Sequence, residues 1–159
     1  MDIRAISDLS LVIELARRIW PEAYAGVLAP AQIDNILSRI YTPENLKAEA
    51  AAGHRFWAAF DGNTALGFAS GYRDGAVVWL KKLYVVPAAQ GRGVGRALLE
   101  TVATAFGPAA EVRLYVNDGN LTAQDFYRRC GFAKAAEMPV KMGDYAFTDF
   151  IFARSINLP

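Results

Sequence analysis

Apolar residues recur at helical spacing in the first third of the chain. Leu15 and Ile19, for example, are four residues apart, so that they share one side of a predicted helix. Ser7 or Asp8 can cap this first helix, and Pro21 is expected to end it. The elements predicted here are a short strand at 2–6 and helices at 8–20, 30–40 and 42–53.

The apolar period changes to two after Gly53, where apolar and aromatic residues favour strands. Turn sequences at 61–63 and 74–75 separate three of these strands, which predicts an antiparallel meander. The third strand leads through a glycine-rich turn into a helix and then a further strand, and this order predicts a parallel strand pair. The predicted strands are 54–60, 64–73, 76–86, 111–116, 132–142 and 145–156, and the later helices are 94–106 and 121–130.

These elements predict an α+β fold. We expect a mixed, mostly antiparallel sheet with one parallel strand pair and helices on both faces. The length of 159 residues suits one domain, spanning residues 1–159.

Composition narrows the function classes. With 53 % apolar residues and a formal net charge of +1, the chain gives no basis for a nucleic-acid binder or a membrane-surface binder. Its longest apolar runs have five residues, whereas a membrane-spanning helix needs roughly 20. Cys130 and His54 are the single residues of their types, too few for an ordinary zinc site. We expect no secretion signal and a cytoplasmic location.

The strongest chemical signal is the glycine-rich turn between Gln90 and Arg96. A strand that enters such a turn and opens a helix presents unpaired N–H groups at the positive end of the helix dipole, which suits a phosphate. Arg92 and Arg96 can add charged hydrogen bonds. The P-loop pattern is absent, and the dinucleotide fingerprint fails because Arg96 stands at its third glycine position. The alternative is a turn that only caps the helix.

Three motifs around this turn resemble the GNAT N-acetyltransferase superfamily. QGRGVG at 90–95 is similar to that family's Q/R-x-x-G-x-G/A motif, and LYVVP at 83–87 resembles its fourth strand. NLTA at 120–123 and FYRRCGF at 126–132 are similar to its N-x-x-A…FY-x-x-x-GF segment. The motifs follow the family's order and spacing, and the remaining predicted elements follow that order too.

The resemblance implies that acetyl-CoA is the cosubstrate. In the family, the backbone of the fourth strand pairs with the pantetheine arm, which implies Leu83 and Val85 here, with the Val85 N–H as the donor to the oxyanion. A splay between two parallel strands leaves such donors unpaired, and the ligand satisfies them. The implied cofactor-binding residues are Leu83, Tyr84, Val85, Gln90, Gly91, Arg92, Gly93, Val94, Gly95, Arg96, Asn120 and Tyr127.

Tyr127 matches the family's frequent general acid, which lies near the sulfur of the leaving coenzyme A. A phenol with a pKa of about 10 is protonated at pH 7 and can donate toward a thiolate. The alternative is a core aromatic that shares a helical face with Cys130, which we expect to be a small buried residue rather than a nucleophile. Asn120 can equally cap the helix that follows it.

The general base has no obvious residue. An alkylammonium with a pKa of about 10.4 is less than about 0.1 % neutral at pH 7, so its proton must leave before attack. Many relatives carry a glutamate shortly before the Leu-x-Val segment, but residues 78–80 contain no carboxylate. Glu22, His54 and a water chain remain as alternatives.

The acceptor is expected beside residues 20–26, between the first two helices. Glu22 and Tyr24 are the candidate acceptor-binding residues, because a carboxylate attracts a cation and aromatic rings enclose it. Trp20 and Tyr24 can alternatively pack the helix onto the sheet. The resemblance implies transfer to a primary amine, with a small molecule or polyamine favoured and no metal required. The alternatives are a peptide or protein α-amine acetyltransferase and a non-catalytic acyl-CoA-binding module, and a homodimer stays open.

Overall fold

The computed structural model describes residues 1–156, apart from the side chains at positions 142 and 145. Five helices and one 3₁₀ turn lie in this part of the chain, at the positions α1 Ser10–Ala23, α2 Pro30–Ile40, α3 Pro43–Ala51, η1 Pro87–Ala89, α4 Val94–Ala105 and α5 Leu121–Arg129. The strands are β1 Asp2–Ala5, β2 Arg55–Asp61, β3 Thr64–Asp74, β4 Val77–Val85, β5 Glu111–Asn117, β6 Ala133–Met142 and β7 Tyr145–Ser155.

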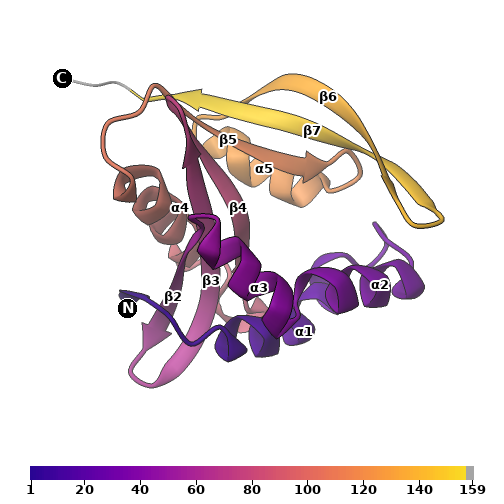
Figure 1. Ribbon diagram of the computed structural model, residues 1–159, viewed down its shortest axis with the longest axis horizontal. Helices are drawn as coiled ribbons and strands as arrows, with labels where there is room; N and C mark the ends of the chain where they lie inside the picture. Colours follow the sequence, from indigo (N-terminus) through magenta and orange to yellow (C-terminus); the bar gives the residue numbers. More distant parts are fainter. Residues whose placement is uncertain (157–159) are drawn as a thin grey trace.

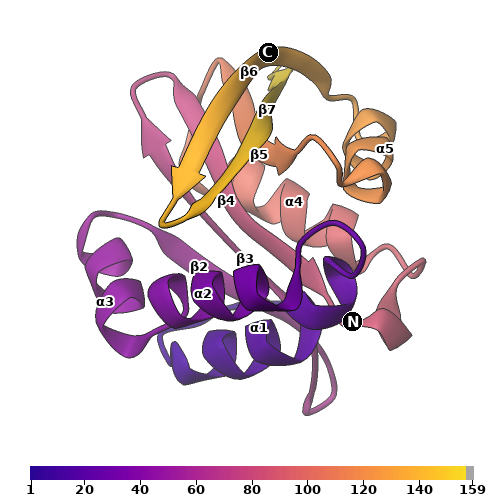
Figure 2. The same ribbon diagram turned by 90° about the vertical axis from the view of Figure 1, so that its right-hand side faces the viewer.

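The seven strands form one sheet in the order β1-β2-β3-β4-β5-β7-β6. Every neighbouring pair is antiparallel except β4 and β5, which are parallel. Helices α1–α3 cover one face of the sheet, and α4 and α5 cover the other (Figures 1 and 2). The expected α+β architecture, with its single parallel pair and helices on both faces, is therefore confirmed.

The prediction that Pro21 ends the first helix is wrong. Helix α1 continues to Ala23, and the Tyr24 N–H still donates to the Trp20 carbonyl at 3.1 Å. Proline removes the bond that position 21 would otherwise donate to the carbonyl of Arg17. Both residues are exposed, so water can satisfy that carbonyl, and α1 continues for two residues past the proline.

The core joins both helical layers to the sheet. Leu98 of α4 and Phe68 of β3 are fully buried, as is Phe152 of β7. Tyr41, which follows α2, is 1 % exposed and packs edge-on against Phe68 with ring centroids 6.1 Å apart. Among the described residues, no helix is both long and apolar enough to cross a membrane.

Candidate active site

The parallel pair opens after four residues. Strands β4 and β5 are paired only from Val77↔Glu111 to Leu80↔Leu114, although both strands continue. A bulge lies at the same level, because Gly71 and Ser70 of β3 face Leu80 and Lys82, which leaves Lys81 as the extra residue. We call the unpaired interval beyond Leu80 the β4–β5 opening.

Leu83 and Val85 direct their backbone groups into this opening. The Val86 N–H donates to the Leu66 carbonyl of β3 at 2.8 Å. Because such bonds alternate along an antiparallel ladder, the N–H groups of Leu83 and Val85 face away from β3. The splay expected from the sequence is therefore present, with its backbone groups on the β5 side. The Val85 carbonyl accepts one long bond, 3.4 Å, from the Gln90 side-chain amide.

The chain then forms the turn that starts α4. Gly91 and Gly93 have φ values of 79° and 80°, in the left-handed region that favours glycine. Ala97 is the first residue of this helix to donate back, to the Gly93 carbonyl at 3.1 Å. The N–H groups of Val94, Gly95 and Arg96 thus have no partner within the helix, so the turn presents donors at the positive end of α4.

Gly95 brings three elements of the site into contact. A Cβ at this position would lie 3.2 Å from the Phe126 ring of α5 and 3.7 Å from the Val85 side chain of β4. The missing side chain therefore lets the start of α4 approach both elements closely. Tyr127, next to Phe126, is brought to the same end of the sheet.

The two arginines of the turn have protein partners. Arg92 lies 3.5 Å from Asp61, and both side chains are more than half exposed. Arg96 donates to the Arg129 carbonyl at the end of α5, at 3.0 Å. Surface contacts of this kind are weak, so both side chains can turn toward a bound anion.

Tyr127 and Asn120 occupy the two ends of α5. The Tyr127 side chain is 9 % exposed, and burial, then the nearby Tyr24, raises the pKa of its phenol, so the hydroxyl stays protonated. The Asn120 side chain accepts a hydrogen bond from the Ala123 N–H at 3.2 Å. Asn120 therefore caps α5, as the capping interpretation predicted.

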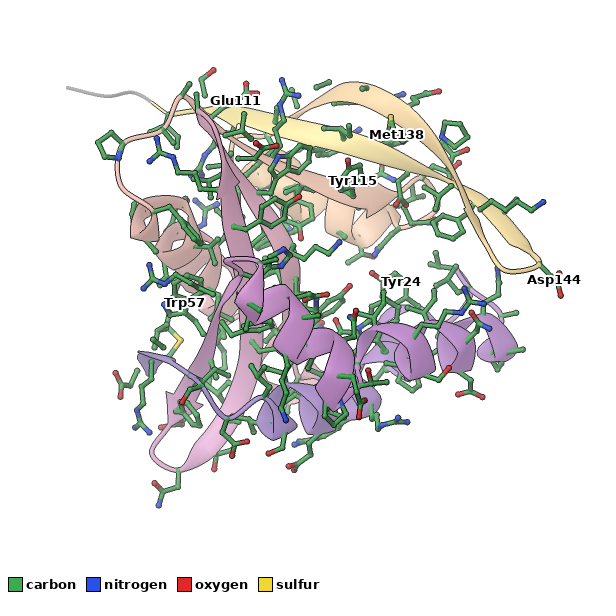
Figure 3. All side chains as sticks on the ribbon, in the orientation of Figure 1. Tyr24, Trp57, Glu111, Tyr115, Met138 and Asp144 are labelled. Carbon is green, nitrogen blue, oxygen red and sulfur yellow. The ribbon has the colours of Figure 1, made fainter. Side chains whose placement is uncertain are left out.

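The side chains of Tyr24 and Tyr84 meet beside the opening, on the face of the sheet that α1–α3 cover. Their hydroxyls lie 2.9 Å apart, and burial raises the pKa of both phenols. Trp20 packs against both rings, with centroid distances of 4.5 Å and 5.3 Å, which fits the packing interpretation. Figure 3 shows Tyr24 beside the helices, with Tyr115 and Met138 on the sheet strands beyond it.

Neither of the proposed bases joins this group. Glu22 is exposed at the end of α1. His54 lies near the half of β4 that is paired with β5. It directly precedes Arg55 of β2, which is level with Gly71 of β3 and Leu80 of β4. Its ring stacks on Tyr72 with centroids 4.4 Å apart, and burial lowers its pKa despite Glu49 at 3.8 Å.

Two buried or half-buried carboxylates were not singled out from the sequence. Glu49 of α3 pairs with Lys82 of β4 at 2.5 Å, and the lysine side chain is only 2 % exposed. Asp149 lies in β7 and is half-buried. Burial, and secondarily Asp118, raises the pKa of Asp149 to about 6. The one sequence signal for Asp149 is a carboxylate inside a strand rich in aromatic residues.

The site has two halves. The glycine-turn side comprises the backbone of Leu83 and Val85 and the turn 90–96. The tyrosine side comprises Tyr24, Tyr84 and Asp149, on the face that α1–α3 cover.

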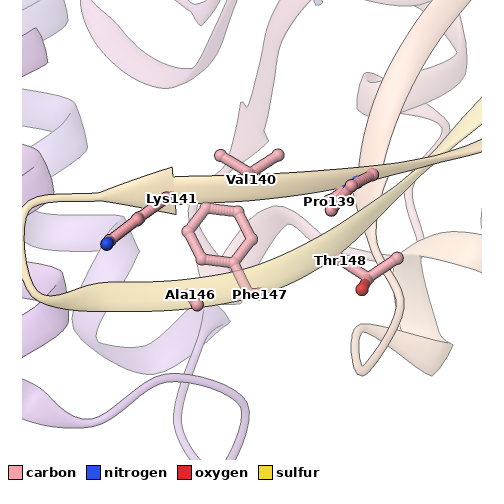
Figure 4. Close-up of a pocket in the computed structure, with 6 residues that line it drawn as sticks. All are labelled: Pro139, Val140, Lys141, Ala146, Phe147 and Thr148. Atoms are coloured by element: carbon pink, nitrogen blue, oxygen red, sulfur yellow. The ribbon is translucent and has the colours of Figure 1, made fainter.

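A separate pocket of about 380 Å³ lies on the β6–β7 hairpin (Figure 4). Its lining residues are Pro139, Val140, Lys141, Ala146, Phe147 and Thr148. None of them is a site residue expected from the sequence, so this pocket is distinct from the glycine-turn side.

Comparison with known proteins agrees with this geometry. The Acetyltransferase (GNAT) family profile matches residues 12–132. The chain is 29 % identical over 158 residues to a spermidine N(1)-acetyltransferase of Thermoplasma acidophilum, covering 94 % of this chain and 92 % of that protein. The crystal structure of the PaiA N-acetyltransferase from Thermoplasma acidophilum in complex with coenzyme A superposes with a TM-score of 0.79, at 26 % identity and with 98 % of each chain covered.

A further solved structure has the same fold at lower sequence identity. The ribosomal-protein-S18-alanine N-acetyltransferase from Escherichia coli has a TM-score of 0.73 at 18 % identity, with 99 % of this chain and 95 % of that chain covered. At this identity the likeness concerns the fold alone.

The chain belongs to the Acetyltransferase (GNAT) family, because the family profile covers most of its length. It is an N-acetyltransferase with acetyl-CoA as cosubstrate, as the sequence motifs implied.

Proposed function

We propose that the protein transfers the acetyl group of acetyl-CoA to a primary amine of a small cationic molecule, with polyamines the favoured class. The observation that carries the cofactor half of this proposal is the β4–β5 opening, where unpaired backbone donors lead directly to the anion-suited turn before α4. The pantetheine arm pairs with Leu83 and Val85, and the diphosphate is held by the N–H groups of the turn.

Two groups act at the thioester in this proposal. The Val85 N–H stabilises the oxyanion that forms on the carbonyl oxygen. The buried Tyr127 hydroxyl, held protonated, donates a proton to the departing sulfur. Asn120 borders the arm while it caps α5.

The acceptor half of the proposal rests on the tyrosine side. Aromatic rings and a carboxylate are suited to a cationic amine, because rings attract cations and carboxylates pair with them. The similarity to a spermidine N(1)-acetyltransferase over most of both chains supports the polyamine class. Glu22, exposed at the end of α1, can hold a distal ammonium group of a polyamine. The single cysteine, Cys130, leads us to place the enzyme in the cytoplasm.

The test is release of coenzyme A thiol from acetyl-CoA with a panel of polyamines, amino acids and peptides. Turnover of spermidine with inert peptides is the expected result. Turnover of peptides alone would instead identify an α-amine acetyltransferase. Tight acetyl-CoA binding with no turnover across the panel would identify a non-catalytic module and overturn the proposal.

A further inference from the structure

Asp149 lies on the acceptor face of the sheet. It is directly opposite Asn117 of β5, and two residues away Tyr115 faces Ile151. Tyr115 stacks on Trp79 of β4, with ring centroids 5.1 Å apart. Trp79 in turn faces Tyr72, whose ring stacks on His54 beside α3. Since opposed strand residues point to the same face, Asp149 projects toward the side that carries α1–α3.

Asp149 is also level with the reacting part of the opening. Because Lys81 is a bulge residue, Tyr84 lies three ladder positions beyond the last β4–β5 pair, Leu80↔Leu114, as Asn117 does. Asp149, the partner of Asn117, is therefore level with Tyr84, between Leu83 and Val85 along the strand direction. Strand β5 lies between β4 and β7, and two strand spacings are about 10 Å in a regular sheet. An amine, or an amine and one water, that lies over the α1–α3 face of β5 can therefore reach from the opening to Asp149.

The surroundings of Asp149 leave its carboxylate available. Among the described side chains it makes no ion pair. Asp118, whose N–H donates to the Thr148 carbonyl at 3.0 Å, repels it, and Lys81 of β4 attracts it. Burial is the main cause that raises the pKa of Tyr24, and the charge of Asp149 adds to this rise. A carboxyl group with a pKa of about 6 is ionised at pH 7 and can accept a proton.

Glu49 is in the opposite situation. It is held by Lys82 at 2.5 Å and by the Asn45 side-chain amide at 3.1 Å. Its carboxylate oxygens are therefore already engaged by protein donors, so they are not free to bind an acceptor ammonium.

We infer that Asp149 is the general base of this enzyme: its carboxylate binds the acceptor ammonium and takes its proton, directly or through one water. This inference rests on the proposed N-acetyltransferase function. It assigns the role for which Glu22 and His54 were the sequence candidates.

The transfer conserves atoms and charge. The ammonium gives one proton to Asp149, and the freed lone pair forms a C–N bond to the thioester carbonyl carbon. The C–S bond breaks with its electron pair on sulfur, and sulfur takes the Tyr127 proton. The nitrogen loses its second proton, which restores the Tyr127 hydroxyl, and Asp149 releases its proton to solvent. One amide, one thiol and one free proton result.

The experiment compares the wild-type enzyme with Asp149→Asn and a matched control, Asp118→Asn, in the full chain. Steady-state turnover of the best amine in the panel is measured from pH 5 to pH 9 with saturating acetyl-CoA. The acetyl-CoA Kd and the Tm of each variant are measured in parallel.

We expect the wild-type kcat/KM for the amine to fall below about pH 6, as Asp149 becomes protonated. Asp149→Asn should lose at least about 100-fold in kcat/KM at pH 7. It should also lose the fall of kcat/KM below about pH 6, which we call the acidic limb of the pH profile. Its residual rate should rise about tenfold per pH unit, because only the neutral amine then reacts. The kcat/KM of Asp118→Asn should stay within about threefold of the wild-type value. Its acidic limb should shift to lower pH, because the substitution removes a negative charge beside Asp149.

Retention of both the rate and the acidic limb in Asp149→Asn would overturn the inference, and so would loss of rate with the limb intact. If Asp149→Asn fails to fold or to bind acetyl-CoA, Asp149→Glu decides: it should keep an acidic limb at a reduced rate, and absence of the limb would exclude the role. Failure of the proposed function looks different, because the wild-type enzyme itself would then turn over no amine.

Discussion

The two sides of the β4–β5 opening use different parts of the chain. The glycine-turn side consists of main-chain N–H groups from one contiguous stretch, Leu83–Arg96, and depends on two left-handed glycines. The tyrosine side consists of side chains from the residue that follows α1, from β4 and from β7. Backbone donors recognise any phosphate ester in the same way, whereas side chains can change without altering the backbone. The cofactor site therefore depends on the backbone conformation of the fold, whereas side-chain substitutions can change the choice of acceptor without changing the fold.

The largest effect is expected at the Lys82–Glu49 pair, which joins β4 to α3 on the face of the tyrosine side. Lys82→Met or Glu49→Gln leaves a buried charge without its partner and should reduce the free energy of unfolding by about 3–5 kcal/mol. The double variant should recover most of this loss. Urea unfolding measures the free energy of unfolding of all three variants. The control is Lys81→Met, at the exposed neighbouring lysine, whose free energy of unfolding should stay within about 0.5 kcal/mol of the wild-type value. Additive losses in the double variant would show that the two side chains do not act as a pair.

Gly93→Asp tests the glycine-turn side. Aspartate adds negative charge where the diphosphate is proposed to lie, and it strains a residue with a φ of 80°. Acetyl-CoA affinity, measured by calorimetry, should fall at least about 100-fold. Gly75→Asp, in the β3–β4 turn with a φ of 58°, carries a similar strain and should leave affinity unchanged. Equal affinity in both variants would remove the anion site from this turn.

Tyr127→Phe tests the point where the two sides meet. Removing the hydroxyl should lower kcat about 10–100-fold and change the acetyl-CoA Kd less than about twofold, because the proton is given only in the transition state. Tyr115→Phe, at the 47 % exposed tyrosine of β5, serves as the control. An unchanged kcat would assign Tyr127 to the core.

The smallest effect is the stability of Asp149→Asn as a function of pH. The pKa of Asp149 is about 6 in the folded chain, against a model-peptide value of 3.8. Between these values the folded state binds more protons than the unfolded chain, so the ionised group destabilises the fold as pH rises through about 6. Asp149→Asn should therefore melt about 2 °C above wild type at pH 8, and the difference should vanish below about pH 4. A variant that is less stable at pH 8 would mean that Asp149 has a stabilising partner.

Much of the fold could be predicted from local signals. The glycines at 53, 91 and 93, the Thr42 cap and the strand–helix–strand order all act within a few residues, so their effects are visible in the linear chain. Pro21 misled the prediction because the helix continues for two residues past the proline, where the carbonyl that it frees at Arg17 is exposed to water. The sequence alone does not state that exposure.

The sequence by itself determined the family, the parallel pair and the turn before α4, since each depends on neighbours along the backbone. Only the tertiary structure decided which acidic residue faces the opening. Asp149 lies 65 positions from Tyr84, so strand register and the bulge at Lys81 bring them to one face. Pairing then distinguishes Asp149 from Glu49, because Glu49 of α3 is held by Lys82 of β4, whereas Asp149 makes no ion pair among the described side chains. This difference depends on how α3 and β7 pack on the sheet, about which the local pattern carries no information.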